Sequence, residues 1–388
     1  MAQLHETPSG RRTVIALFGR RNAGKSSLLN AITGQDVALV SHVKGTTTDP
    51  VSKAMELLPL GPVQLIDTPG IDDEGSLGQL RVARTMQILK KTDIALLVTD
   101  QRELLPEEQE LIQQFAHMGI PYLLVHSKAD ISQSTDEGIW VSAVTGEGID
   151  GLRQRIAMLA TDAPEPPLVA DLVKPGEMAV LVVPIDKAAP KGRLILPQQQ
   201  TIRELLDNGT VAMVCRDTEL ADTLGKLSEP PKLVITDSQV FGKVSGIVPE
   251  SVPLTSFSIL MARYKGDLPA LVAGAGAVDN LKSGDKILIA EGCTHHRQCD
   301  DIGTVKLPNW IRRYTGLEPE FYFCSGGDFP EDLHPYKMVI HCGGCMQTRR
   351  EMGCRLALCQ AQGIPVTNYG VLIAYLNGIL KRTLTPFQ

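Results

Sequence analysis

Two cysteines and a histidine stand close together in the stretch His341–Cys345, which reads HCGGC. A C-x-x-C pair supplies two thiolates, which can hold zinc, join an iron–sulfur cluster or act as a redox dithiol. Seven of the eight cysteines fall in the last hundred residues. Because the chain is long and its amino terminus has no apolar leader segment, this clustering favours metal binding over disulfides.

A second pattern, CTH at 293–295, is separated from His341 by 45 residues. Cys293 follows the apolar run KILIA and Cys342 follows KMVIH, so each is expected at the carboxyl end of a strand, where open α/β sheets bind ligands. If those strands are neighbours, three thiolates converge in one crevice, from Cys293, Cys342 and Cys345. The glycines between the last two would let the loop turn tightly and leave backbone N–H groups for cluster sulfides.

Zinc is the main alternative to iron, because C-x-x-C with one more cysteine and a histidine could form a tetrahedral site. Structural zinc sites usually combine two short ligand pairs, whereas these residues follow strands, which favours a functional cluster. Cys299 could add a fourth thiolate. Cys324 is expected to line the crevice without binding metal. The remaining cysteines are expected in cores, at Cys215, Cys354 and Cys359.

The stretch Gly19–Ser26, GRRNAGKS, matches the phosphate-binding pattern G-x-x-x-x-G-K-S/T at every fixed position. It follows the run TVIALF and opens the helical pattern KSSLLNAIT, which is the context that the motif needs. Lys25 is expected to reach the β- and γ-phosphates and Ser26 to bind Mg²⁺, while backbone N–H groups surround the phosphates. The predicted phosphate-site residues are Gly19, Asn22, Ala23, Gly24, Lys25, Ser26 and Ser27.

Two further motifs complete the phosphate side of this site. GTTTDP, at 45–50, places Thr46, Thr47 and Thr48 on a switch segment that could close over the γ-phosphate and Mg²⁺. DTPG, at 67–70, places Asp67 to hold Mg²⁺ through water and the Gly70 N–H to meet the γ-phosphate. The predicted catalytic residues are Lys25, Thr47, Asp67 and Gly70, and Ser26 and Thr47 are the predicted magnesium ligands.

The base side is predicted by SKAD at 127–130 and SAV at 142–144. Asp130 would accept two hydrogen bonds from the guanine N1–H and exocyclic amine, which adenine cannot offer. Ser142 and Ala143 would contact the guanine O6, and Ser127 and Lys128 would shape the base loop. The site therefore predicts GTP as the ligand.

The elements that must position these residues alternate between short apolar runs and helical patterns. Between 13 and about 160, five runs read as buried parallel strands: TVIALF, VQLID, IALLVTD, YLLVHS and IWVSA. Alternation resumes at 178, so we predict an α/β protein with a doubly wound P-loop GTPase sheet and two smaller α/β domains. The predicted boundaries are 1–162 for the GTPase domain, 163–177 for a proline-rich linker that stays out of any core, 178–265 for a dimerisation domain and 266–388 for a cluster-binding domain.

The first part of the chain resembles the translation-factor-class GTPases of the Era/TrmE type, which carry the motifs quoted above. That resemblance implies a tether from the base loop to the P-loop by an asparagine, where this chain has Ser127, so a weaker hold on the base is expected. Ile71 stands where Ras-like proteins carry a water-orienting glutamine. Asn22 is similar to the residue that holds potassium in related GTPases, so slow, potassium-stimulated hydrolysis is expected.

The whole motif order resembles the maturation GTPases of [FeFe]-hydrogenase, which join such a domain to a dimerisation domain and an iron–sulfur domain. The resemblance implies a [4Fe–4S] cluster on Cys293, Cys342 and Cys345, with a fourth ligand from His295, His341, His296 or solvent. It also implies a homodimer that receives a diiron precursor from radical-SAM maturases and delivers it to apo-hydrogenase. The implied cofactors are GTP, Mg²⁺, K⁺ and the cluster.

Composition limits the alternatives. The net charge of −6 and the absence of basic runs count against a large nucleic-acid surface, and so against an Era/TrmE-type GTPase acting on tRNA or the ribosome. A redox enzyme using Cys342 and Cys345 as a dithiol also stays open. No apolar run reaches the length of a membrane span, so we expect no membrane partner and a cytoplasmic location.

Overall fold

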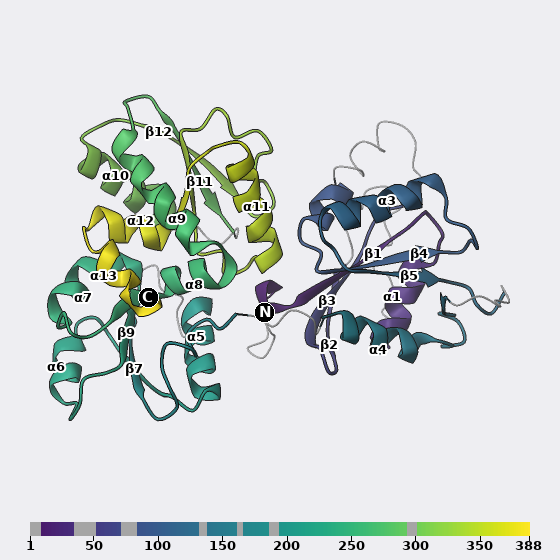
Figure 1. The fold of residues 1–388 in the computed structure, drawn as a ribbon, viewed down its shortest axis with the longest axis horizontal. Helices are drawn as coiled ribbons and strands as arrows, with labels where there is room; N and C mark the ends of the chain where they lie inside the picture. The colour runs from purple at the N-terminus through teal and green to yellow at the C-terminus, as the bar shows by residue number, and fades with distance from the viewer. Residues whose placement is uncertain are drawn as a thin grey trace. The chain divides into compact units, whose positions relative to one another are not determined.

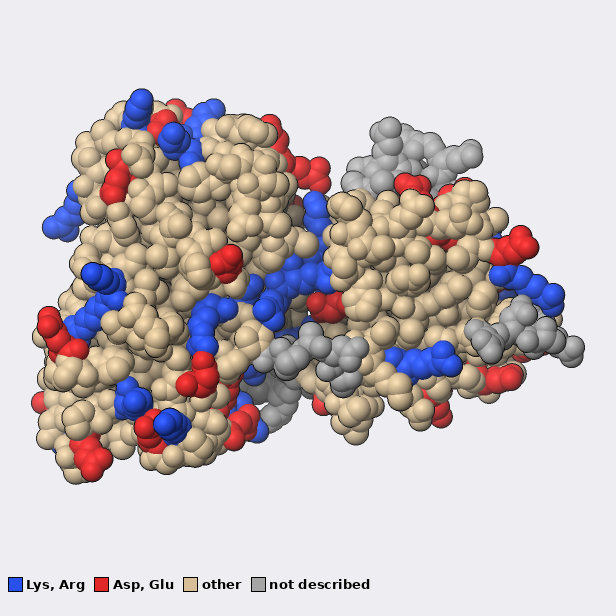
Figure 2. Space-filling model, in the orientation of Figure 1, with Lys and Arg blue, Asp and Glu red and all other residues tan. Residues whose placement is uncertain are grey.

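The computed structural model describes residues 9–34, 52–70, 84–131, 138–160, 166–185, 194–292 and 301–388. The chain forms two compact units, Met1–Glu165 and Pro166–Gln388 (Figure 1). Within the described residues, no helix is long and apolar enough to cross a lipid bilayer. Basic and acidic side chains are both spread among uncharged ones on the face drawn in Figure 2.

The first unit contains a six-stranded sheet in the order β2-β3-β1-β4-β5-β6. Its strands are β1 (Thr13–Phe18), β2 (Ser52–Leu57), β3 (Gly61–Asp67), β4 (Ile94–Thr99), β5 (Tyr122–His126) and β6 (Ile139–Trp140). The five predicted strands form and pair in parallel, which confirms the doubly wound sheet. The edge strand β2 pairs antiparallel with β3 and was missed, because its sequence SKAMEL is half exposed and carries little apolar signal.

Helices cover both faces of this sheet. Alternate residues of β1 point to opposite faces, as a strand requires. On one face, Ile15 and Leu17 pack with residues of α1 (Lys25–Thr33) and α4 (Ile149–Ala160). On the other, Phe18 packs with Leu111 and Phe115 of α3 (Pro106–His117).

The second unit begins with a four-stranded parallel sheet in the order β10-β9-β7-β8. Its strands are β7 (Met178–Val182), β8 (Val211–Cys215), β9 (Leu233–Thr236) and β10 (Leu254–Ser256). Its helices are α5 (Leu196–Asp207), α6 (Leu220–Gly225), α7 (Phe241–Ile247) and α8 (Phe257–Lys265). Leu254–Ser256 form the buried strand β10, and the Ser256 hydroxyl then caps α8 by accepting from the Ile259 N–H.

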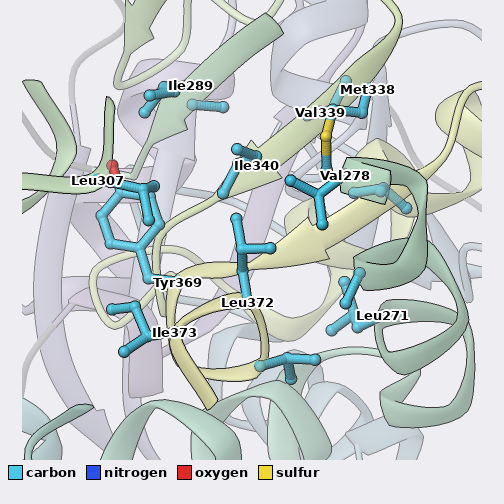
Figure 3. Close-up of a cluster of buried hydrophobic side chains, with 14 of the residues drawn as sticks. Leu271, Val278, Ile289, Leu307, Met338, Val339, Ile340, Tyr369, Leu372 and Ile373 are labelled. Carbon is cyan, nitrogen blue, oxygen red and sulfur yellow. The ribbon is translucent and has the colours of Figure 1, made fainter. Parts of the chain in front are cut away.

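A second parallel sheet follows in the same unit, in the order β12-β11-β13-β14. Its strands are β11 (Lys286–Glu291), β12 (Glu320–Ser325), β13 (Met338–His341) and β14 (Val366–Asn368). Its helices are α9 (Leu268–Ala275), α10 (Leu307–Thr315), α11 (Arg349–Ala361), α12 (Tyr369–Leu376) and α13 (Leu380–Leu384). Figure 3 shows the shared core, in which Ile289 of β11 and Ile340 of β13 lie with Leu372 of α12.

The predicted linker, 163–177, does not stay out of a core in its described part. Leu168, Val169 and Val173 are completely buried and pack with Leu181 of β7. Burying the apolar side chains that follow the prolines is more favourable than leaving them exposed to water on an extended chain. The second unit therefore begins within the predicted linker, at Pro166.

Candidate functional site

The P-loop is shaped by backbone conformations that its residue types permit. Gly19 has φ 142°, and a Cβ there would lie 2.1 Å from the Val98 carbonyl oxygen, so only glycine fits. Asn22 is left-handed with φ 61°, which asparagine tolerates better than most residues. Gly24 precedes α1 with φ 92°. The loop thus turns directly into the helix N-terminus, where the dipole and free N–H groups favour phosphate.

Lys25 is held at the floor of this loop. Its side chain is 7% exposed, and the ammonium donates to the carbonyl oxygens of Gly19 at 2.9 Å and Arg20 at 2.7 Å. These contacts hold the cation beside the turn that would surround the phosphates. That Lys25 binds phosphate oxygens stays a prediction from the motif.

Ser26 and Asp67 meet at the predicted magnesium site. The Ser26 hydroxyl donates to Oδ2 of Asp67, which ends β3. Burial raises the pKa of the Asp67 carboxyl, against the opposing hydrogen bond of Ser26 and the charge of Lys25. The other oxygen, Oδ1, is buried and has no hydrogen-bond partner among the described residues. A serine hydroxyl beside a carboxylate with one free buried oxygen fits Mg²⁺, which prefers oxygen ligands and retains water.

Ser127 links the base loop to the P-loop. Its side chain is buried, and the hydroxyl donates to the carbonyl oxygen of Ala23 in the P-loop at 2.7 Å. It also lies 3.3 Å from the carbonyl oxygen of Thr99 at the end of β4. The shorter serine thus still links the base loop to the P-loop, and the weaker hold on the base stays a prediction.

A charge network makes a second link between these loops, which the sequence did not suggest. Asp100 accepts from Arg20 of the P-loop at 3.1 Å and from Lys128 of the base loop at 2.7 Å. Hydrogen bonds from Lys128 and Gln101 lower the pKa of Asp100 against its desolvation. Arg20 also lies 3.8 Å from the buried carboxylate of Glu108.

The two base motifs meet at Asp130. Its Oδ1 accepts from the Ser142 hydroxyl at 2.6 Å, and the carboxylate is otherwise exposed. The same hydroxyl accepts from the N–H groups of Val144 and Thr145, which folds the SAV segment around it. Ala143 thus lies in a turn beside an oriented carboxylate. The predicted switch residues Thr46, Thr47 and Thr48 lie outside the described residues, as does Ile71.

The cysteine loop follows β13, the neighbour of β11, as the crevice prediction required. Cys342 Sγ accepts from the Gly292 N–H at 3.0 Å and lies 3.4 Å from the Gly344 nitrogen, so the loop supplies backbone donors to sulfur. Gly292 is the residue directly before Cys293. The chain that leads to Cys293 therefore reaches the cysteine loop at the last residue described before this gap. Cys342 and Cys345 are both half-buried.

The described residues hold only part of the predicted ligand set. Within them, no three His, Cys, Asp or Glu side chains are grouped to hold a metal. Cys293, His295, His296 and Cys299 lie outside the described residues. The chemistry of the remaining donor set, two thiols on a loop with amides directed at sulfur, fits an iron–sulfur cluster.

His341 does not fit the role of fourth ligand. It is 1% exposed; its Nδ1 lies 2.9 Å from the Cys342 carbonyl oxygen, and its Nε2 lies 3.0 Å from a guanidinium nitrogen of Arg355. Burial and the Arg355 charge lower the pKa of His341 to about 3, so the ring is neutral. Both ring nitrogens are engaged, so this conformation leaves neither for iron.

The other cysteines take different places. Burial raises the pKa of Cys324 to about 11, and its side chain packs against the core. Cys359 is completely buried, as predicted. Cys354 and Cys215 are half-buried rather than fully internal.

Three family models match the chain. They are a 50S ribosome-binding GTPase over residues 14–128, the hydrogen maturase F dimerization domain over 168–266, and the hydrogen maturase F tetramerization domain over 269–386. Among curated proteins, the tRNA modification GTPase MnmE of Nitrosospira multiformis is 38% identical over 151 residues, covering 36% of this chain and 33% of that protein. MnmE of Dichelobacter nodosus is 38% identical over 157 residues, covering 38% of this chain and 34% of that protein.

The chain thus spans about a third of the length of these relatives. Among solved structures, the G domain of the T. maritima FeoB iron transporter is 25% identical, covers 39% of this chain and all of that one, and has a TM-score of 0.32. Aquifex aeolicus Era is 20% identical, covers 52% of this chain and 92% of that one, and has a TM-score of 0.34.

The GTPase match coincides with the unit that carries the P-loop, Asp67 and the base loop. The two hydrogen maturase F matches follow it in order and contain the two four-stranded sheets and the cysteine loop. The three matches follow one another along the chain, and the chain belongs to the hydrogen maturase F family.

Proposed function

We propose that this GTPase is a scaffold that holds a [4Fe–4S] cluster and carries a diiron precursor from radical-SAM maturases to apo-[FeFe]-hydrogenase. The observation that supports it most is the contact of Gly292 with Cys342 across adjacent strands, because it brings the chain leading to Cys293 to the cysteine loop. The predicted ligands are Cys293, Cys342 and Cys345. The fourth iron would then be left to His295, His296, Cys299 or solvent, and an exchangeable position suits a cargo site.

The protein's own groups have distinct roles in this proposal. The cysteine thiolates bind the cluster, and the backbone N–H groups of Gly292 and Gly344 stabilise negative charge on sulfur. His341, fixed by Arg355, orients the strand end rather than binding iron. When bound, the cluster supplies an iron site to which the diiron unit can attach.

At the other site, Ser26 and Thr47 would bind Mg²⁺, Asp67 would hold it through water, and Lys25 would neutralise the phosphates. Asn22 would hold K⁺ beside the phosphates, where an arginine finger acts in other GTPases. Ile71 stands where the water-orienting glutamine is found in Ras-like proteins, so hydrolysis should be slow. We infer that GTP acts as a switch ligand that biases partner contacts rather than as an energy source for cluster chemistry.

The cluster is tested by anaerobic reconstitution of the full chain with iron and sulfide. The wild-type protein and a Cys354→Ala control should gain a cluster absorption spectrum, whereas Cys342→Ala and Cys293→Ala should lose it. A colourless protein that retains zinc under the same conditions would overturn the cluster assignment.

The carrier role is tested by maturing apo-[FeFe]-hydrogenase together with the two radical enzymes. Cys293→Ala should abolish hydrogenase activation, while Cys354→Ala should leave it unchanged. Full activation by Cys293→Ala would reject the role of this cluster in the scaffold.

The potassium site is tested by GTP turnover in K⁺ and Na⁺ buffers of equal ionic strength. Wild-type turnover should be faster in K⁺, and Asn22→Gly, which keeps the left-handed backbone accessible, should remove the difference. Equal turnover of the wild-type protein in both buffers would contradict potassium stimulation.

The dimerization and tetramerization domains support self-association, and we propose a homodimer as its basic form. A role on tRNA or the ribosome is the second candidate, favoured by the 38% identity to MnmE. That identity is confined to the GTPase part of the chain. Binding of tRNA that withstands physiological salt would favour this candidate over the scaffold.

A further inference from the structure

A buried lysine lies beneath the cysteine loop. Lys265, the last residue of α8, is 2% exposed, and its ammonium donates to the carbonyl oxygens of Gly344 at 3.0 Å, Cys345 at 3.1 Å and Gln347. A lysine has three N–H donors, and three carbonyl oxygens of this loop accept from the Lys265 ammonium. Lys265 thus connects α8, which belongs to the sheet β10-β9-β7-β8, to the loop that follows β13 of the sheet β12-β11-β13-β14.

A charge buried this deeply needs compensation, because removing an ammonium from water is expensive unless dipoles or an opposite charge replace the solvent. Here three loop carbonyls supply those dipoles. An apolar side chain would fill the same space without that penalty, so the buried cation indicates that the loop requires a donor for its carbonyl oxygens. Those carbonyls belong to the same short loop that carries Cys342 and Cys345.

The contacts also orient the loop's amides. In a trans peptide the C=O and N–H bonds point in opposite directions. Anchoring the Gly344 and Cys345 carbonyls on Lys265 therefore turns the N–H groups of Cys345 and Met346 away from the ammonium. Gly344 permits the turn with φ 61°. A Cβ at Gly344 would lie 2.7 Å from the Met352 sulfur, so the backbone here is closely packed.

We propose that Lys265 is a positioning residue for the cluster: it fixes the C-x-x-C loop and places a permanent positive charge beside an anionic iron–sulfur group. The inference rests on the proposed cluster at Cys342 and Cys345. A cluster held by thiolates carries net negative charge, which grows on reduction. A fixed cation nearby stabilises the cluster and favours its reduced form.

The test compares Lys265→Met with Lys265→Arg and with Lys337→Met. Lys337 is exposed and precedes β13 at the end opposite the cysteine loop, so its replacement removes the same charge without touching the loop. After anaerobic reconstitution, Lys265→Met should retain iron about 10- to 100-fold less tightly than the wild-type protein, as for other residues that support metal ligands. Its cluster should have a more negative reduction potential. Lys265→Arg, which keeps the charge, should shift the potential less, and Lys337→Met should not shift it.

Hydrogen exchange of the metal-free chain gives a second measurement that does not depend on the cluster. The amides of residues 343–348 should exchange faster in Lys265→Met than in the wild-type protein or Lys337→Met. If the wild-type protein takes up no cluster, the proposed function fails, and exchange alone then decides whether Lys265 orders the loop. Unchanged iron retention, potential and exchange in Lys265→Met would overturn the inference.

If circular dichroism shows that Lys265→Met does not fold, Lys265→Arg and Lys265→Gln are compared instead. Equal reduction potentials for these two variants would overturn the inference.

Discussion

Ser127 joins two loops of the nucleotide site through one hydroxyl group. The hydroxyl donates to the Ala23 carbonyl at 2.7 Å, so a buried hydrogen bond joins the base loop to the P-loop. Asp100 links the same loops through partly exposed ion pairs, by accepting from Arg20 and Lys128. Because the second link is more exposed, salt and solvent weaken it, and the buried hydroxyl should carry more of the coupling.

We predict that Ser127→Ala lowers GTP affinity about 3- to 10-fold, the equivalent of one net hydrogen bond. Ser127→Asn should keep the affinity close to that of the wild-type protein, since its longer amide can also reach the P-loop. Titration of a fluorescent GTP analogue measures both. Ser52→Ala, on the exposed edge strand β2, is the matched control. An affinity of Ser127→Ala equal to that of the control would show that the tether does not support the base loop.

His341 and Arg355 form a buried polar pair beneath the cysteine loop. Arg355 donates to the imidazole at 3.0 Å and to Glu351 at 2.9 Å, and its guanidinium lies 5.0 Å from the centre of the Phe329 ring. Removing the imidazole leaves a guanidinium N–H without its acceptor inside the fold. An unpaired buried donor destabilises more than the hydrogen bond itself contributes.

His341→Ala should therefore lower the free energy of unfolding of the second unit by about 1–3 kcal/mol. His341→Gln, which offers an acceptor oxygen, should lose less. Urea unfolding followed by circular dichroism measures the change, with His334→Ala as the control, since His334 is exposed. A loss in the control as large as in His341→Ala would contradict a specific role for the pair.

At the scale of elements, the two sheets of the second unit each end in a strand with exposed apolar residues. On β8, Val211 and Val214 are 48% and 45% exposed, and on β12, Tyr322 and Phe323 are 40% and 39% exposed. Both strands are sheet edges among the described residues. An unpaired edge offers N–H and C=O groups to another chain. Since β8 lies in the dimerization match and β12 in the tetramerization match, each edge is a candidate contact with a second copy.

We predict that Val211→Lys combined with Val214→Lys converts the proposed homodimer to a monomer, because charge on an edge strand opposes pairing. Phe323→Lys should instead weaken only the association of dimers. Light scattering after size-exclusion chromatography measures the masses. Val144→Lys places the same charge on an apolar residue that is 85% exposed in the GTPase unit and is the control. A dimer that survives the β8 changes would place the interface elsewhere.

The elements that could be predicted are those with a continuous apolar run. All five runs of the GTPase sheet became strands, because burial on both faces demands an unbroken apolar sequence. The strands β2 and β10 were missed: one is half exposed, and the other merges in sequence with the helix it precedes.

The residues that could be predicted are those whose motif fixes a chemical role, such as Lys25, Ser26 and Asp67. Lys265 could not be, because its partners are main-chain carbonyls about eighty residues away, and carbonyls have no sequence signature. Arg355 pairs with His341 across the turn from β13 to α11 and gives no local pattern either. Long-range polar contacts of this kind appear only in the folded chain.

At the scale of the whole molecule, the chain divides into a unit that binds nucleotide and a unit that carries the cysteine loop. Each has its own sheets and its own hydrophobic core. Units of this kind are expected to unfold in separate steps unless a large interface couples them. A ligand stabilises only the unit that binds it, so the two sites can be read independently in one experiment.

Calorimetry of the full chain should therefore show two unfolding transitions. GTP with Mg²⁺ at about 100 times its dissociation constant should stabilise the first unit by about 2.7 kcal/mol, which raises its midpoint by roughly 5–10 °C. Lys25→Met should remove that shift, and Cys354→Ala should keep it. Reconstitution with iron and sulfide should raise the other midpoint. If GTP also moves the second transition, and Lys25→Met abolishes both movements, then binding energy crosses between the units, and the size of that second shift measures the coupling that a GTP switch needs to control the cluster.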